Sequence, residues 1–182
     1  MKSRKGGKRS RRNLGAVAGL VALAGCASHI DELKDARPSG SAFDQALTKD
    51  YQAYVANQVA QDNWHYADYF AQKGLDAAKG MAVPPESVSK WNIPPDKQET
   101  MNSYRQRLVA ALEKGARTAK PEYAAQAQVS FDCWLQKLEE NNIVETHVWI
   151  AGSDTIAASP DEYAVAACKS KFLMQLAKAE GK

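Results

Sequence analysis

Residues 131–141 read Phe-Asp-Cys-Trp-Leu-Gln-Lys-Leu-Glu-Glu-Asn, and this stretch decides the expected fold. Its large apolar residues recur at intervals of three and four positions, at Phe131, Trp134, Leu135 and Leu138. That spacing places them on one face of an α-helix. The helix that contains them is predicted to span residues 121–141, because Ala124 and Ala127 extend the same face toward its amino end.

The same pattern recurs on both sides of this helix. Alanine is abundant, β-branched residues are sparse, and apolar positions repeat at helical spacing. Four further helices are predicted, over residues 41–61, 64–79, 96–118 and 159–178, the last opened by a Ser-Pro-Asp-Glu capping box. The first two of these resemble one tetratricopeptide-like helical hairpin, and no second copy follows at a fixed period. We therefore expect a mainly α protein, a bundle of about five helices.

Two segments interrupt the helical pattern. Residues 81–97 contain two Pro-Pro pairs, which exclude a helix interior. In residues 142–158, β-branched residues alternate with other side chains from Val144 to Ile150. This alternation predicts a short extended segment near 143–151.

The amino-terminal residues have the order of an export signal. Residues 1–13 carry seven Lys or Arg and no acid, and about 11 apolar residues follow, too few to span a bilayer. Leu23-Ala24-Gly25-Cys26 comes next and resembles the bacterial lipobox. The resemblance implies cleavage between Gly25 and Cys26 and acylation of Cys26. Arg11-Arg12 leaves both the general secretory and the twin-arginine routes open.

These assignments divide the chain into three parts. Residues 1–25 are the expected lipoprotein signal peptide, 26–40 a lipid-anchored tether and 41–179 a helical periplasmic domain. The whole chain has 24 Lys or Arg against 21 Asp or Glu, a formal charge of +3. Removing the seven basic residues of the signal leaves 17 against 21, or −4. The basic character therefore belongs to export, and no nucleic-acid partner is expected.

Two cysteines remain after Cys26 is assigned to lipid. Cys133 and Cys168 form an even pair in an exported chain, which favours a disulfide, and each falls on the expected core side of a helix. Two buried free thiols are the alternative. A catalytic thiol at Cys133 served by His147 is not favoured, because nothing supplies an orienting third group or an oxyanion site.

The stretch 131–141 also resembles the Phe-Asp-Cys-Trp-x₄-Glu-Glu-Asn signature of OmpA-family lipoproteins from alphaproteobacteria, in their N-terminal region. Residues 42–47, 63–75, 107–117 and 166–172 resemble further segments of that family. The resemblance implies an envelope lipoprotein, and Ala27 after the acylated cysteine is compatible with transport to the outer membrane. The connection between the two cysteine segments is longer here. Such proteins usually continue into a C-terminal peptidoglycan-binding domain, whereas this chain ends at Lys182, so wall binding is not implied.

The expected function is that of a non-enzymatic outer-membrane lipoprotein facing the periplasm, with a helical domain for envelope organisation or protein–protein interaction. Candidate partner contacts are Trp91 and Trp149, although each is expected to fold back onto the bundle. A peptidoglycan- or ligand-binding module using a groove near Trp64 and Tyr66 is the first alternative.

A small envelope hydrolase is the second alternative. The sequence contains no G-x-S-x-G motif, no H-E-x-x-H motif and no phosphate-binding glycine loop, so nothing in it supports this alternative. His29, His65 and His147 are scattered along the chain, and Glu139-Glu140 is expected to be a solvated helix end. We expect no catalytic residue, metal or cofactor.

Overall fold

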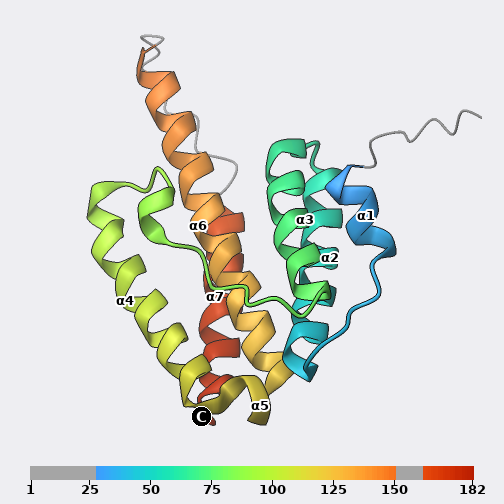
Figure 1. Cartoon of the computed structure of the whole chain (residues 1–182). Helices are drawn as coiled ribbons and strands as arrows, with labels where there is room; N and C mark the ends of the chain where they lie inside the picture. Colours follow the sequence, from blue (N-terminus) through green and yellow to red (C-terminus); the bar gives the residue numbers. More distant parts are fainter. Residues whose placement is uncertain (1–27, 151–161) are drawn as a thin grey trace, which may run out of the picture.

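The computed structural model describes residues 28–150 and 162–182, with the helical backbone alone for 143–150 (Figure 1). The predicted signal peptide, the cleavage and lipidation site at Gly25 and Cys26, and the capping box at Ser159 lie outside the described residues. Within them the chain is a helical bundle without strands, so the predicted fold class is confirmed. None of the described helices is long and apolar enough to cross a bilayer.

Six longer helices form the bundle. They are α1 (His29–Asp35), α2 (Ala42–Ala60), α3 (Trp64–Ala78), α4 (Pro95–Ala111), α6 (Pro121–Ile150) and α7 (Glu162–Ala179). The short helices η1 (Val88–Lys90), η2 (Leu112–Ala116) and α5 (Arg117–Ala119) lie in the connections. Ser41 and Asp44 form a capping box that starts α2. Figure 1 shows α2 and α3 as an antiparallel hairpin packed beside the pair α6 and α7.

Aromatic side chains pack between the two helices of each pair. Phe131 and Trp134 of α6 contact Phe172 of α7, with ring centroids 5.4 and 5.9 Å apart. On the hairpin, Tyr51 and Phe70 are fully buried and stack at 6.3 Å. The apolar face that the spacing in residues 131–138 predicted is thus the buried face of α6.

The predicted tether is wrong for the part of it that the structure describes. Residues 29–35 form α1, which is capped by Ser28 and packs against α3. Leu33 is buried over Gly74, where an added Cβ would lie 2.7 Å from the Leu33 side chain. The helix was missed because seven residues with one buried leucine show no periodicity, and packing stabilises so short a helix more than propensity does.

The extended segment predicted near 143–151 is also wrong up to Ile150, because α6 continues as a helix to that residue. The cost of a β-branched residue in a helix is only tenths of a kcal/mol, and adding residues to an existing helix is far easier than starting one. The helix predicted over 96–118 is interrupted instead. It changes to a π turn at η2, where Gly115 has φ 106° and a side chain would be strained.

Residues 79–94, called the strap from here on, connect α3 to α4. They contain Pro84, Pro85 and Pro94 and only one turn of helix, η1, in agreement with the irregular segment predicted there. The strap crosses the front of α6 and α7 in Figure 1. It buries Val83, Val88, Trp91 and Ile93, so it is part of the core.

Candidate functional site

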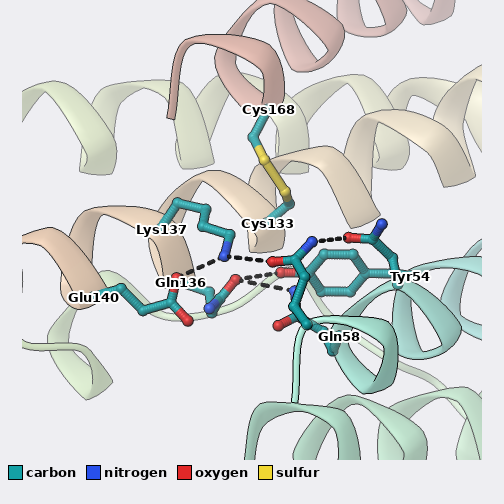
Figure 2. The surroundings of a disulfide bond; sticks show 9 residues. Tyr54, Gln58, Cys133, Gln136, Lys137, Glu140 and Cys168 are labelled. Carbon is teal, nitrogen blue, oxygen red and sulfur yellow. Dashed lines mark hydrogen bonds and ion pairs between the residues drawn. A yellow bond between two sulfur atoms is a disulfide. The ribbon is translucent and has the colours of Figure 1, made fainter. Parts of the chain in front are cut away.

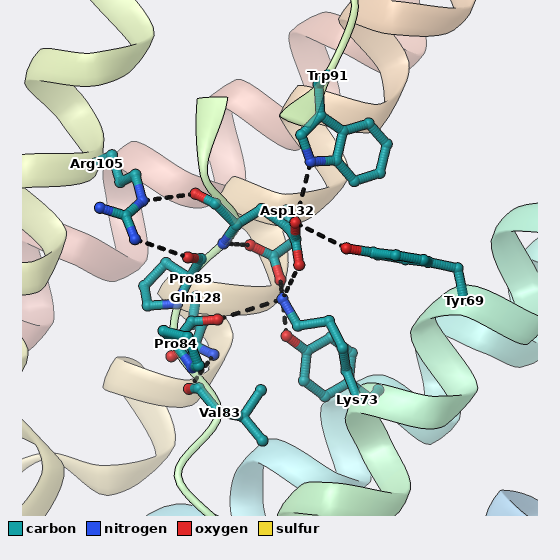
Figure 3. Close-up of polar contacts among 11 residues, drawn as sticks. Tyr69, Lys73, Val83, Pro84, Pro85, Trp91, Arg105, Gln128 and Asp132 are labelled. Carbon is teal, nitrogen blue, oxygen red and sulfur yellow. Dashed lines mark hydrogen bonds and ion pairs between the residues drawn. The ribbon is translucent and has the colours of Figure 1, made fainter. Parts of the chain in front are cut away.

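Three charged side chains meet inside the bundle (Figure 3). Lys73 on α3 places its Nζ 2.6 Å from Glu86 Oε1 on the strap and 2.7 Å from Asp132 Oδ2 on α6. The exposed fractions of these side chains are 12%, 5% and 0% for Lys73, Glu86 and Asp132. We call this group the ionic centre. It joins three elements that are separated in the sequence.

Every carboxylate oxygen of the ionic centre accepts a hydrogen bond. The Tyr51 hydroxyl donates to Asp132 Oδ2 at 2.7 Å, and the backbone N–H of Glu86 donates to Asp132 Oδ1 at 2.9 Å. The Tyr69 hydroxyl and the Trp91 indole N–H donate to Glu86 Oε2 at 2.9 and 3.1 Å. The buried charges are therefore both paired and hydrogen-bonded, which offsets much of their desolvation cost.

The pKa values follow from this arrangement. Burial alone would lower the pKa of Lys73, but the carboxylates of Asp132 and Glu86 leave it above its usual value. Burial alone would raise the pKa of Glu86, yet its contact with Lys73 leaves it lowered. For Asp132, burial is the largest effect and raises the pKa against the opposing charge of Lys73. An ammonium group held in its charged form has no lone pair for nucleophilic attack, so the ionic centre is suited to holding helices together.

The same centre fixes the path of the strap. Four consecutive carbonyls, from Val83 to Glu86, accept hydrogen bonds from side chains of the surrounding helices. Arg105 on α4 donates to the carbonyls of Glu86 and Pro85 at 2.7 and 3.2 Å. Gln128 on α6 donates to Val83 at 2.9 Å, and Lys73 donates to Pro84 at 3.3 Å. The carbonyls of residues 83–86 are thus satisfied without regular secondary structure.

The two glutamates at the end of the 131–141 stretch are not a solvated helix end, so that expectation is wrong. Glu139 accepts from the Tyr66 hydroxyl at 2.9 Å and from the backbone N–H of Asn92 at 2.7 Å. Glu140 accepts from the Asn63 side chain and pairs with Lys137 at 2.7 Å (Figure 2). These bonds connect α6 to the strap and to the turn between α2 and α3.

Cys133 and Cys168 lie at disulfide distance, as the predicted bond between them requires (Figure 2). Their Cα atoms are 5.8 Å apart, and the pair links α6 to α7. Cys133 is the neighbour of Asp132, so adjacent residues of the same stretch connect α6 to α7 and to α3. The side chain of His147, proposed as a partner of Cys133 in the unfavoured catalytic reading, lies outside the described residues.

Of the remaining sequence candidates, Trp91 contacts the ionic centre through Glu86. Trp91 is 9% exposed and stacks on Tyr66 at 6.0 Å, so it folds back onto the bundle as expected. The side chain of Trp149 lies outside the described residues. His29 contacts Asp68 at 3.1 Å, whereas His65 packs against Tyr66. Among residues 28–150 and 162–182, no three metal-ligating side chains form a group that could hold an ion.

Two surface hollows accompany these groups. An aromatic recess of about 370 Å³ is lined by His65, Tyr66, Tyr69, Lys90, Trp91 and Glu139. Trp64 does not line it and is 55% exposed. At the end of the bundle where α7 finishes, a cleft of about 500 Å³ contains Arg107 and Glu180. Arg107 makes two 2.6 Å bonds to Glu180, which lower the pKa of that carboxyl to about 2.

Sequence reasoning missed the ionic centre. Lys73 and Asp132 each interrupt the apolar face of a helix, beside Phe70 and Phe131 respectively, and a charge on a core-facing position is the signal that could have found them. Glu86, between two prolines and a serine, carries no such signal.

No family model matches the chain, and no curated protein or solved structure is significantly similar to it.

Proposed function

We propose that this chain is a lipid-anchored protein of the bacterial cell envelope whose helical domain binds a protein partner and catalyses no reaction. The proposal rests on the amino-terminal sequence, in which a basic segment, an apolar segment and Leu23-Ala24-Gly25-Cys26 follow one another as in a lipoprotein export signal. The structural observation that best supports this proposal is the position of the first helix. Ser28, only two positions after Cys26, already caps α1, which packs on the bundle. An acylated Cys26 would hold the folded domain directly at a membrane.

The internal contacts support a binding role rather than catalysis. The ionic centre is buried, and all four of its carboxylate oxygens accept bonds from the protein itself. Glu139 and Glu140 likewise accept hydrogen bonds from side chains of other elements, Tyr66 and Asn63. A general acid or base must be free to exchange a proton with a substrate, whereas these carboxylates already accept hydrogen bonds from within the protein. The location that we propose is the outer membrane, with the domain facing the periplasm, in keeping with Ala27 and the resemblance to OmpA-family lipoproteins.

Metabolic labelling with a palmitate analogue tests the anchor. The protein should take up label, and Cys26→Ser should abolish it. Cys133→Ser with Cys168→Ser is the matched control, because it also replaces cysteines but should keep the label. Label that survives Cys26→Ser would overturn the proposal. Density-gradient separation of the two membranes then measures the location.

A partner is tested by crosslinking the lipidated protein in cells. Capture of one protein at constant stoichiometry, through an exposed residue of the domain, is the expected result. The same capture by unfolded or reduced protein would show that the contact does not depend on the fold, and it would count against a specific partner.

The aromatic recess favours ligand or peptidoglycan binding as a second candidate function. Tyr69 is 38% exposed at its edge, whereas Trp91 forms its buried floor. Such a recess suits the apolar face of a sugar or a peptide side chain. Co-sedimentation of the purified protein with sacculi, reduced by Tyr69→Ala but not by Tyr123→Ala, is the expected result. Failure of the unaltered protein to sediment removes this candidate.

A further inference from the structure

Trp64 is a large apolar side chain that the bundle leaves uncovered. It is the first residue of α3 and is 55% exposed, and among the described residues no ring stacks on it. The beginning of α1 lies close to it, because His29 Nδ1 is 3.1 Å from Asp68, one helical turn after Trp64. Figure 1 shows the beginnings of α1 and α3 at the same end of the bundle.

The distance from Cys26 to this end is short. Two residues span at most about 7 Å between Cys26 and Ser28. The four residues from Trp64 to Asp68 rise about 6 Å along α3. A lipid on Cys26 would therefore begin within about 7 Å of Ser28, at the end of the bundle where α1 and α3 begin.

We propose that the end of the bundle formed by the beginnings of α1 and α3 lies against the phospholipid surface, with the Trp64 ring in the membrane interface. This inference rests on the proposed acylation of Cys26. Tryptophan is favoured at this depth because its ring is apolar while its N–H can reach water or headgroups. The contact gives the exposed ring an environment that the protein itself does not provide.

The charges at this end indicate which lipids it accepts. Asp31 and Glu32 lie in the first turn of α1, and Asp62 lies in the turn before α3. Anionic lipids attract basic segments and would repel these carboxylates. We therefore assign the surface to zwitterionic phospholipid, so the contact should not weaken when salt is raised.

The carboxyl end of α6 points to the same side. The Asn63 side chain bonds to Glu140, and α6 continues ten residues beyond Glu140 to Ile150, about 15 Å. The projection is visible in Figure 1. A flat surface that touches Trp64 must also accommodate this projection, so the bundle would lie tilted on the membrane.

Photocrosslinking of the full-length, lipidated protein tests the orientation. Trp64→p-benzoylphenylalanine is compared with Tyr123→p-benzoylphenylalanine, which places the same group on an exposed residue at the opposite end, where α6 begins. Both proteins are irradiated in vesicles of radiolabelled phosphatidylethanolamine. Lipid adducts are expected at position 64 and not at 123, at low and high salt alike.

The acyl group on Cys26 is measured by mass spectrometry in the same samples. An acylated protein that gives no lipid adduct at position 64, or equal adducts at both positions, overturns the orientation and leaves the anchor standing. A protein without the acyl group overturns both. Trp64 is exposed, so its replacement should preserve the fold, which near-ultraviolet circular dichroism verifies.

Discussion

Removing the positive charge of the ionic centre should strongly destabilise the domain. Lys73→Met keeps most of the side-chain volume but leaves Asp132 and Glu86 facing each other without a cation. Both carboxylates contact the same Nζ atom, at 2.7 and 2.6 Å, so their nearest oxygens lie within about 5 Å of each other. At an effective dielectric constant of ~20, two charges at that distance repel by about 3 kcal/mol.

This value agrees with the cost of breaking a buried ion pair, about 3–5 kcal/mol. It is a large part of the ~5–15 kcal/mol that stabilises a typical domain. In urea, with m of about 2 kcal/mol/M, the midpoint of unfolding should fall by roughly 2 M. Unfolding of the oxidised protein is followed by circular dichroism at pH 7.

Lys97→Met is the matched control. Lys97 pairs with Asp96 at 2.7 Å, but both side chains are more than half exposed, so its loss should leave the midpoint of unfolding nearly unchanged. Adding Glu86→Gln to Lys73→Met should recover part of the loss, since one of the two opposed charges is gone. Equal costs for Lys73→Met and Lys97→Met would refute the reasoning.

The loss should also depend on pH. In Lys73→Met the two carboxylates can share a proton, which raises one of their pKa values. The variant should therefore gain stability relative to the unaltered protein as the pH falls from 7 to 5. In the unaltered protein Glu86 acts the opposite way, because its lowered pKa contributes stability that is lost as the pH falls through that pKa.

Three further changes test other contacts. Gly74→Ala should displace Leu33, at a cost of about 1–3 kcal/mol. The better helix propensity of alanine partly offsets this cost, so overall stability should change little, whereas amide hydrogen exchange in α1 should become faster. Burial raises the pKa of Asp50 to about 6, so ionising this carboxyl costs the folded protein stability. Asp50→Asn should therefore stabilise the protein by about 1–2 kcal/mol at pH 7.5, a figure reduced because Asp50 is partly exposed, and by nothing below pH 4. Unfolding curves of both proteins at the two pH values measure the difference. Cys133→Ser with Cys168→Ser should cost up to about 4 kcal/mol for a separation of 35 residues, and an unchanged melting temperature would contradict this.

The helices could be predicted where apolar spacing reports burial directly. The buried faces of α3 and α6 follow from that spacing, as do the Pro-rich connection and the proximity of Cys133 to Cys168. The helix α1 could not, because it depends on the match between Leu33 and the missing side chain of Gly74, 41 positions later. No local pattern contains that information.

The candidate site was less predictable for a related reason. Asp132 stood out in the sequence only as a member of a resemblance, and Glu139 was expected to be solvated, whereas the structure gives each a bonded role inside the protein. Their partners, Glu86 and Asn92, are on the strap, whose composition predicts no more than the absence of helix. Which residues of an irregular segment become buried is decided by the helices beneath it.

The bond between Cys133 and Cys168 also closes a covalent ring that contains every residue from 133 to 168. A protease that cut the chain once within this ring would separate no fragment, because both pieces would stay joined through the sulfur atoms. The cut would become visible only after reduction, as two bands on a denaturing gel. A cut between the carboxyl end of α6 and the beginning of α7 would thus leave the protein a single molecule.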